Sequence, residues 1–354
     1  MKAESFVECL KSNGVGFFAG VPDSLLKSFC AYLTDTCASA HVIAANEGGA
    51  VALAAGYHLA TGKLACVYMQ NSGQGNAVNP LASLADPDVY SIPMVLVVGW
   101  RGEPGVKDEP QHLKQGKVTV TLFETLGIPT ETLPDDGYAA LELVEKMVTR
   151  AKEESRPVAL VVRKGWFEDY ALKAKRPDIA AVKREAAIEE ILADLPPDAV
   201  VVSTTGMISR EVYETRVRRG EGHARDFLTV GSMGHALMIA LGIAREQPKR
   251  PVVCIDGDGA AILQMGNLAI AGRSGATNLT HVVLNNAAHD SVGGQPTVGG
   301  EIDLTAIAEA CGYNTVNGPT FREIKVAKGA RKDLGRPKEK PQVNKALFME
   351  TLAK

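Results

Sequence analysis

Short apolar runs recur along the chain, and each is followed by a stretch with helical periodicity. Strands that are apolar on both faces are typical of parallel sheets covered by helices on both sides. Parallel neighbours need a crossover of about a dozen residues or more, and the helical stretches fill those connections. The pattern therefore predicts an α/β fold. In the first half the runs are VGFFAG (15–20), HVIAAN (41–46), KLACVYMQ (63–70), PMVLVVGW (93–100) and PVALVVRKG (157–165).

The pattern stops at a charged stretch, 167–184, and then restarts. This stretch contains Pro177 and indicates a linker. A chain of 354 residues is long enough for two domains of ordinary size. We therefore expect two domains, 1–166 and 185–354, each with roughly six parallel strands between helices. The restarted runs are AVVVSTT (199–205), PVVCID (251–256) and THVVLNN (280–286).

Two further runs near the carboxyl end stand too close together. YNTV (313–316) and FREIKV (321–326) both have the composition of strands, but only NGPT (317–320) separates them. This spacing is too short for a crossover between parallel strands. Either the two runs form a hairpin, or an expected crossover helix is absent.

Composition and charge narrow the class of partner. The net charge of −3 gives no reason to expect nucleic acid or an anionic membrane surface. No apolar stretch reaches the ~18 residues of a membrane span, and the acidic start of the chain indicates an amphipathic helix and no signal peptide. Six cysteines without a CxxC pair indicate reduced thiols. We expect a cytoplasmic protein that binds a small molecule.

Two polar motifs follow neighbouring apolar runs of the second half. Gly257-Asp258-Gly259 follows PVVCID, and Asn285-Asn286 ends THVVLNN. Open α/β sheets bind ligands at the carboxyl ends of their strands. The glycines allow close approach of a bulky anion, while the aspartate and an asparagine carbonyl offer the oxygen ligands that Mg²⁺ prefers. A GDG sequence alone is also typical of an ordinary strand-to-helix turn, but the second motif favours a clamp for a metal and a diphosphate.

A carboxylate in the first half occupies a comparable position. Glu47 follows HVIAAN and precedes a helical stretch of small residues, with Gly48 and Gly49 beside it. It could face a cleft, or it could be an ordinary first-turn acid stabilised by the helix dipole. In the second half the loop 231–234 (GSMG) also precedes a helix of small residues, whose amino terminus could hold a diphosphate.

The spacing from GDG to NN resembles the cofactor signature of thiamine diphosphate-dependent enzymes. This resemblance implies that Asp258, Asn286 and the main-chain carbonyl of Ala288 hold Mg²⁺, with Asn285 as the alternative register. It also implies that Glu47 is the activating glutamate, which hydrogen-bonds the aminopyrimidine ring of thiamine diphosphate.

Other positions match loops that contact the cofactor in that family. Met233 matches a bulky apolar residue that lies between the two cofactor rings, although most methionines simply pack. The resemblance implies further cofactor contacts at Asn71, Ser72, Gly73, Gly231, Ser232, Gly257, Gly259, Ala260, His289, Asp290 and Ser291.

Within that family the chain is similar to the compact decarboxylases of phosphonopyruvate and sulfopyruvate, because the linker leaves no room for a third domain. FAGVPDSLLKSF, ANEGGAVALAAGYHLATG, GWRGEPGVKDEPQH and LNNAAHDSVGGQPTVG carry this resemblance. It implies decarboxylation of 3-phosphonopyruvate to phosphonoacetaldehyde and CO₂, a step of phosphonate biosynthesis, with Asp23 and His112 as acid–base groups. It also implies a homodimer at least, with the cofactor between subunits. The chain departs from the family near 314–319, where the family has a longer crossover.

The substrate's phosphonate needs cations, because the carboxylate must lose its charge as CO₂. Arg101, Lys107 and Arg331 are the candidates, since arginine binds such oxygens in a bidentate manner, although solvated surface charge is the plainer interpretation. Three alternatives stay open: a sulfopyruvate decarboxylase, a carboligase with the same cofactor, and a non-catalytic nucleotide-binding protein. The last lacks support, because neither a GxGxxG after the first strand nor a GxxxxGK[ST] is present.

Overall fold

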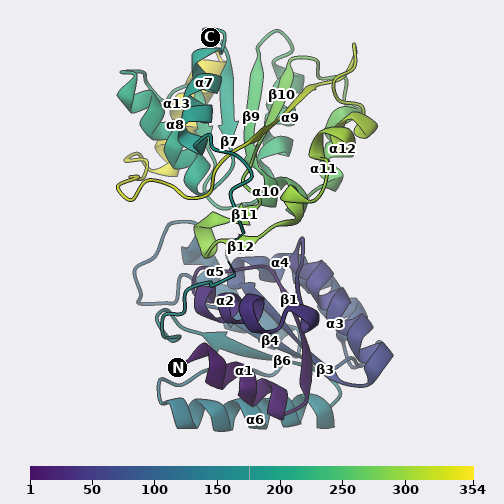
Figure 1. The fold of residues 1–354 in the computed structure, drawn as a ribbon. Helices are drawn as coiled ribbons and strands as arrows, with labels where there is room; N and C mark the ends of the chain where they lie inside the picture. Colours follow the sequence, from purple (N-terminus) through teal and green to yellow (C-terminus); the bar gives the residue numbers. More distant parts are fainter. Residues whose placement is uncertain (175) are drawn as a thin grey trace. The chain divides into compact units, whose positions relative to one another are not determined.

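The computed structural model describes residues 1–174 and 176–354. The chain forms two compact units, each with its own sheet (Figure 1). Unit 1 is Met1–Lys175 with Val292–Gln295, and unit 2 is Arg176–Ser291 with Pro296–Lys354. The main division thus falls inside the stretch 167–184.

The sheet of unit 1 has six strands, all parallel, in the order β2-β1-β3-β4-β6-β5. Five of them coincide with the apolar runs, so the expected fold class is confirmed. We did not expect β5, because this edge strand has only three residues, of which two are threonines. The strands are β1 (Val15–Gly20), β2 (His41–Ile43), β3 (Leu64–Gln70), β4 (Met94–Gly99), β5 (Thr130–Thr132) and β6 (Pro157–Val162).

Helices cover both faces of this sheet. On one face Phe6, Phe29 and Val144 pack against the β4 residue Val95. On the other face alanines 50, 54 and 77 allow a close approach to β3 and β4. The helices are α1 (Ala3–Ser12), α2 (Lys27–Thr36), α3 (Glu47–Thr61), α4 (Gln74–Pro80), α5 (His112–Thr125) and α6 (Gly137–Glu153), with short turns η1 (Ala38–Ala40), η2 (Asn71–Gly73) and η3 (Leu81–Ala85).

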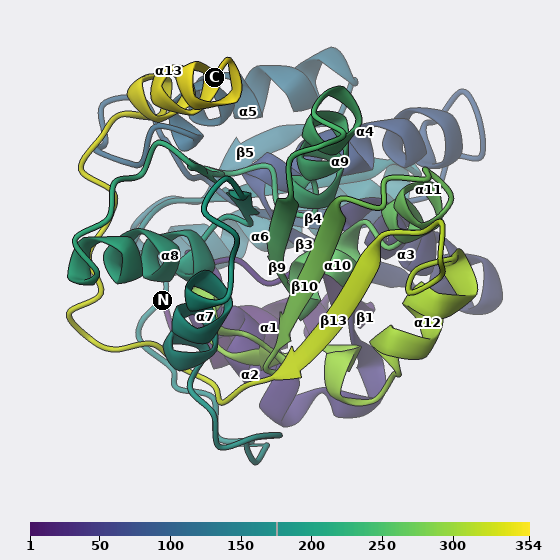
Figure 2. The same cartoon turned by 90° about the horizontal axis from the view of Figure 1, so that it is seen from above.

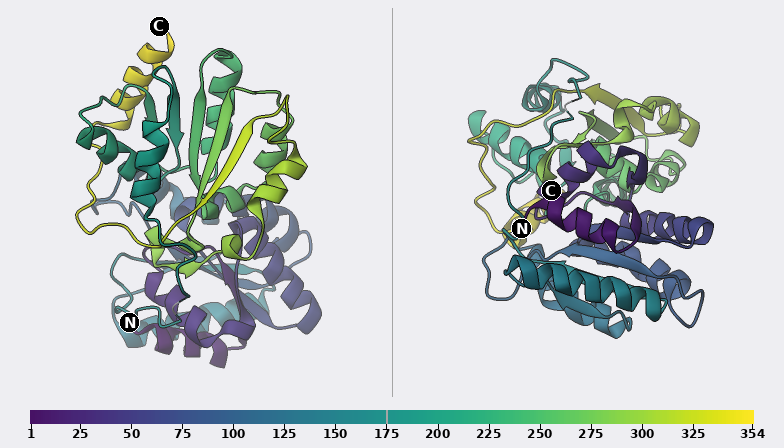
Figure 3. Two further views of the ribbon diagram at one scale, coloured as in Figure 1. Left: turned by 45° about the horizontal axis from the view of Figure 1, so that its top comes forward. Right: turned by 60° about the horizontal axis from the view of Figure 1, so that its bottom comes forward.

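The sheet of unit 2 has five parallel strands in the order β13-β10-β9-β7-β8. Figures 2 and 3 show β13 as the outermost strand beside β10. A separate two-stranded ribbon consists of β11 and β12. The strands are β7 (Val200–Ser203), β8 (Asp226–Leu228), β9 (Val252–Gly257), β10 (Leu279–Asn285), β11 (Ala288–His289), β12 (Gln295–Pro296) and β13 (Thr320–Lys325).

Two apolar layers again enclose the sheet. Ile188 and Val212 pack on one face, and Leu237 and Leu268 pack on the other. Among the described residues, no helix is both long enough and apolar enough to cross a membrane, and all six cysteines are free. The helices are α7 (Arg184–Ala193), α8 (Met207–Arg218), α9 (Ala236–Glu246), α10 (Asp258–Leu263), α11 (Gly266–Gly272), α12 (Leu304–Cys311) and α13 (Pro341–Leu352), with turns η4 (Asp290–Val292) and η5 (Val298–Gly300).

The segment after α12 corrects one expectation. YNTV is a turn and no strand, so the predicted pair of adjacent strands is wrong. The helix ends at Gly312 in the left-handed conformation, and the chain then passes directly into β13, which pairs with β10 in parallel. Therefore α12 itself is the crossover between β10 and β13. With too few residues for a further strand and helix, the sheet has five strands instead of six.

A single asparagine closes this turn. Asn314 has a φ of 56°, its N–H donates to Pro319 O (2.9 Å), and its Oδ1 accepts from Phe321 N (2.8 Å). Asparagine tolerates the left-handed region better than other residues with a side chain, apart from aspartate. The residue therefore satisfies two requirements of the turn together.

Substitution of Asn314 should separate these two requirements. Asn314→Gly keeps the backbone freedom but removes the acceptor, and we expect a loss of about 1 kcal/mol. Asn314→Ala removes both, and we expect about 2 kcal/mol, because alanine adds the strain of positive φ. Urea unfolding followed by circular dichroism measures both values. Equal stability of the two variants and the parent chain would contradict this account of the turn.

Candidate active site

A buried carboxyl lies beyond the end of β1. Asp23 is fully buried, and its carboxylate accepts from Gln70 Nε2 (2.5 Å) and Leu25 N (2.9 Å). A Cβ atom at Gly99, the last residue of β4, would collide with this carboxylate. Burial raises the pKa of Asp23, although the hydrogen bonds oppose the rise. The carboxyl ends of β1, β3 and β4 thus meet around one group that can hold a proton.

Glu47 is the first residue of α3, where Asn46 caps the helix by accepting from Gly49 N (2.9 Å). The Glu47 side chain is buried, and its carboxylate accepts from Asn76 Nδ2 (2.7 Å). A Cβ atom at Gly73 would collide with the carboxylate, so a glycine is needed there. Burial raises the pKa of Glu47. The position is therefore more than an exposed first-turn acid, because its carboxylate is buried and held by Asn76.

A cation and an imidazole follow β4. The Arg101 guanidinium donates to both carboxylate oxygens of Asp108 (2.8 and 2.5 Å) and to Ser24 Oγ (2.8 Å). His112, the first residue of α5, is buried, and among the described residues its Nδ1 has no hydrogen-bond partner. Burial, assisted by the Arg101 charge, lowers the pKa of His112 to about 4. The imidazole is therefore neutral near pH 7 and can accept a proton.

The polar turn after β3 mainly joins loops of unit 1. Asn71 is fully buried and donates to Arg101 O (2.7 Å) and Thr119 Oγ1 (2.8 Å). Ser72 is exposed and donates to Gln70 Oε1 (2.8 Å). Lys107 is exposed on the following loop. These contacts join the turn after β3 to the loop after β4 and to α5, and they hold Gln70, which donates to Asp23.

In unit 2, Asp258 follows β9 as the first residue of α10. Its buried carboxylate accepts from Thr297 Oγ1 and from the backbone N–H groups of Asn286 and Gly259. Burial raises the pKa of Asp258 to about 6, although these bonds favour the ionised form. A buried carboxylate is stabilised by a bound cation, so its surroundings fit a hard metal ion with oxygen ligands.

The amide of Asn286 has a defined orientation. Its Nδ2 donates to Asp290 Oδ2 (2.6 Å), and its Oδ1 accepts from Ala288 N (3.0 Å). Asp290 is itself held by the Arg184 guanidinium (3.0 Å) and by Gly329 N (2.8 Å). Because the carboxylate occupies the amide nitrogen, the carbonyl oxygen is the atom that can serve a cation.

The neighbouring Asn285 has a different environment. It is fully buried, and its Nδ2 donates to Gly299 O (2.6 Å) and to Glu323 Oε1 of β13 (2.7 Å). Its amide thus joins β10 to β13 and to the loop after β12. Its Oδ1 accepts from Ala287 N (3.0 Å), just as the Oδ1 of Asn286 accepts from Ala288 N, so Asn286 remains the expected metal ligand and Asn285 the alternative register.

Two expected positions of unit 2, Met233 and His289, lie at the GDG turn. A Cβ atom at Gly259 would lie 3.0 Å from His289 Cε1 and 3.6 Å from Met233 Cε. Burial lowers the pKa of His289 to about 4, so its imidazole is neutral. Ser232, beside Met233, has a φ of 48° and is exposed. An apolar side chain and a neutral imidazole therefore flank the proposed diphosphate clamp.

Some of the remaining expected residues are adjacent to this turn in sequence, and the others lie on other loops. Gly257 ends β9 and Ala260 lies in α10, both next to Asp258 in sequence. Gly231 N donates to Thr205 Oγ1 in the loop after β7 (2.9 Å), while Ser291 is exposed. Arg331 forms ion pairs with Glu185, Glu214 and Asp333.

Two family models match the chain. The thiamine pyrophosphate enzyme N-terminal TPP binding domain covers residues 2–121, and the C-terminal TPP binding domain covers residues 204–341. The chain is also 36% identical to the phosphonopyruvate decarboxylase of Streptomyces hygroscopicus, over 99% of this chain and 94% of that protein. The chain belongs to the thiamine pyrophosphate enzyme family. The family resemblance of the GDG and NN motifs is thereby confirmed, and the non-catalytic nucleotide-binding alternative is wrong.

Two other relatives of this thiamine pyrophosphate enzyme have similar coverage. The phosphonopyruvate decarboxylase of Streptomyces viridochromogenes is 36% identical over 96% of this chain and 92% of that protein. The sulfopyruvate decarboxylase of Methanosarcina acetivorans is 28% identical over 87% and 82%. The matched N-terminal domain lies in unit 1 with Glu47, and the matched C-terminal domain includes Asp258 and Asn286.

Some residues that shape this thiamine pyrophosphate enzyme's candidate site were not expected. Asn76 bonds to Glu47, and Thr297 bonds to Asp258. Thr297 lies in a string that carried the resemblance, and Asn76 lies three residues after the expected Gly73, so a closer examination of these segments could have found both. Arg184 gave no indication in the sequence, because a charged residue at the end of a linker is usually exposed.

Gly73 provides a test of the space around Glu47. Its φ of −78° suits alanine, so Gly73→Ala should mainly displace the Glu47 carboxylate and leave stability nearly unchanged. We expect thiazolium C2 proton exchange, followed by NMR on bound thiamine diphosphate, to slow by about 10² or more. The control is Gly75→Ala, where nothing lies within 4 Å of an added Cβ atom. Normal exchange in Gly73→Ala would contradict the need for glycine.

Proposed function

We propose that this enzyme decarboxylates 3-phosphonopyruvate to phosphonoacetaldehyde and CO₂ with thiamine diphosphate and Mg²⁺. The observation that carries the proposal is the 36% identity over 99% of the chain with a phosphonopyruvate decarboxylase, against 28% over 87% with a sulfopyruvate decarboxylase. The two sets of polar side chains at strand ends support it, because each suits one half of the cofactor.

Thiamine diphosphate, when bound, supplies the carbon nucleophile for the ketone and accepts the electron pair that CO₂ leaves behind. Glu47 would share a proton with the aminopyrimidine ring, because burial raises the pKa of its carboxyl and Asn76 fixes one of its oxygens. Asp258, the Oδ1 of Asn286 and the carbonyl of Ala288 would hold Mg²⁺ at the diphosphate. Gly259 would admit the diphosphate beside Met233 and His289.

The overall reaction breaks one carbon–carbon bond and puts a proton where CO₂ was. Asp23 can supply that proton, since burial raises the pKa of its carboxyl. His112 is neutral, and its unpartnered Nδ1 can accept a proton or a hydrogen bond from the substrate. We propose these two residues of unit 1 as the acid–base pair.

Arg101 is our first choice for the phosphonate. It lies beside Ser24, next to Asp23 in sequence, and its guanidinium is already oriented by Asp108. Lys107 lies exposed on the same loop and could add a second charge. Arg331 would have to exchange its ion pairs with Glu185 and Glu214 for the substrate. Because Arg331 would first have to give up these ion pairs, Arg101 and Lys107 are the residues to test first.

We also propose self-association, with a second copy of this chain completing the cofactor site. Sulfopyruvate decarboxylases include proteins named as separate alpha and beta subunits. An alpha subunit from Methanococcus maripaludis matches 47% of this chain, and a beta subunit from Methanothermobacter thermautotrophicus matches 42%. A cytoplasmic location accords with the six free cysteines.

Turnover of both acids tests the proposed reaction. We expect purified enzyme to release CO₂ and a trappable aldehyde from phosphonopyruvate only when thiamine diphosphate and Mg²⁺ are present. The kcat/KM for sulfopyruvate should be lower by about tenfold or more, which corresponds to ~1.4 kcal/mol of transition-state binding. A higher kcat/KM for sulfopyruvate would overturn the substrate assignment, and acyloin products would indicate a carboligase.

Glu47→Gln tests the proposed proton transfer. The amide keeps the shape of the side chain but cannot exchange a carboxyl proton, so thiamine diphosphate should still bind. We expect decarboxylation and C2 proton exchange to slow by about 10²–10⁴. Calorimetric titration of the cofactor provides the binding control. Unchanged C2 exchange with bound cofactor would remove Glu47 from the mechanism.

A further inference from the structure

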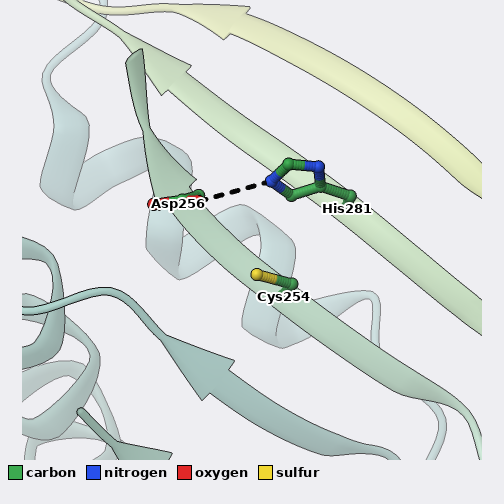
Figure 4. Close-up of side chains that lie close together, drawn as sticks. All are labelled: Cys254, Asp256 and His281. Atoms are coloured by element: carbon green, nitrogen blue, oxygen red, sulfur yellow. Dashed lines mark ion pairs between the residues drawn. The ribbon is translucent and has the colours of Figure 1, made fainter. Parts of the chain in front are cut away.

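Three potential metal ligands lie inside the sheet of unit 2 (Figure 4). Cys254 and Asp256 belong to β9, and His281 belongs to β10, opposite Cys254 in the register. All three are at most 1% exposed. One ligand atom from each lies within 4.8 Å of the other two, and His281 Nε2 is 3.6 Å from Asp256 Oδ2. The residues alternate along β9, so both side chains project from the same face.

The imidazole of this cluster and the neighbouring phenol lack hydrogen-bond partners among the described residues. Among the described residues, neither ring nitrogen of His281 has a hydrogen bond, and nor does the Tyr313 hydroxyl. The Tyr313 ring lies 6.3 Å from the imidazole, and Phe321 contacts the imidazole edge to face at 5.4 Å. A buried polar group without a partner costs about 1–3 kcal/mol, so such a group calls for a bound ion or water.

We propose that Cys254, Asp256 and His281 bind one Zn²⁺ ion inside unit 2. A thiolate, an imidazole and a carboxylate form a donor set that suits zinc better than Mg²⁺, which requires oxygen ligands. Zinc bonds of about 2.0–2.3 Å place neighbouring ligand atoms roughly 3–4 Å apart, and the 3.6 Å between His281 and Asp256 falls in this range. A water molecule or the Tyr313 oxygen can complete a tetrahedron.

Burial determines how this site would fill. The Cys254 side chain is fully buried, and zinc binds a cysteine as the thiolate, so the ion would have to displace the thiol proton. The ligands are inaccessible in the folded unit, which means that the ion would enter during folding. Zinc would then stabilise unit 2 structurally, with no part in the decarboxylation.

The zinc ion would also stabilise the backbone next to the proposed magnesium site. Asp256 Oδ1 accepts from Gly257 N (3.0 Å), immediately before Asp258. An Asp256 carboxylate fixed by zinc would hold the backbone of the GDG turn in place. The two sites remain distinct. The zinc ligands would be a thiolate, an imidazole and a carboxylate on the face of the sheet, whereas all the magnesium ligands would be oxygens at its edge.

Metal analysis of the full chain tests the proposal. The enzyme should be expressed without a histidine tag, purified without chelators, and analysed by inductively coupled plasma mass spectrometry. We expect about one zinc per chain, and a fall of about tenfold or more in Cys254→Ser. Cys66→Ser is the control, because Cys66 is equally buried in unit 1 but lies outside the cluster. Zinc at background level in the parent chain would overturn the proposal.

Two further measurements keep the result clear if Cys254→Ser folds poorly. The parent chain refolded from denaturant with Co²⁺ should show a thiolate-to-cobalt charge-transfer band, and refolding with Zn²⁺ should raise the unfolding temperature. Absence of both effects would overturn the site. Asp258→Ala should keep its zinc while losing Mg²⁺-dependent cofactor binding. Loss of zinc in Asp258→Ala would place the metal at the cofactor site and refute a separate one.

Discussion

The strands of the two large sheets run parallel, and this constraint decides where the reactive side chains lie. Parallel hydrogen bonding puts the carboxyl end of every strand at one edge, so residues distant in sequence become neighbours. Asp23 and Gln70 meet in unit 1 in this way. Asp258 and Asn286 meet in unit 2 for the same reason. Polar groups that follow successive apolar runs in such a sequence are therefore expected to lie close together in the fold.

Burial then makes these groups chemically useful. Glu47 and Asp258 are buried carboxyls: Glu47 accepts from Asn76, and Asp258 accepts from Thr297 and from two backbone N–H groups. Desolvation raises the pKa of both carboxyls, while their hydrogen bonds oppose the rise. The Glu47 carboxylate occupies the space that a side chain at position 73 would fill, so Gly73 makes room for it.

Strands, helices and family could be predicted because they depend on local patterns and on motifs with fixed spacing. The GDG and NN motifs are short and lie at strand ends, so Asp258 and Asn286 could be recognised in the sequence as candidate metal ligands. The orientation of Asn286 was not, because it depends on Asp290 and Arg184, which tertiary structure alone brings together. The strand expected at YNTV failed for another reason: composition suggested a strand where the chain had too few residues to connect one.

The shortened connection after α12 also affects how this chain meets other chains. β5 is the edge strand beside β6 in unit 1, and β13 is the edge strand beside β10 in unit 2. Among the described residues, no strand of the sheet pairs with the outer side of β13. An uncovered border of this kind invites a foreign strand to add to it. Arg322 and Lys325 are exposed along β13, and charges at such a border discourage that addition. The two positive charges on β13 therefore oppose the addition of a foreign strand to this edge.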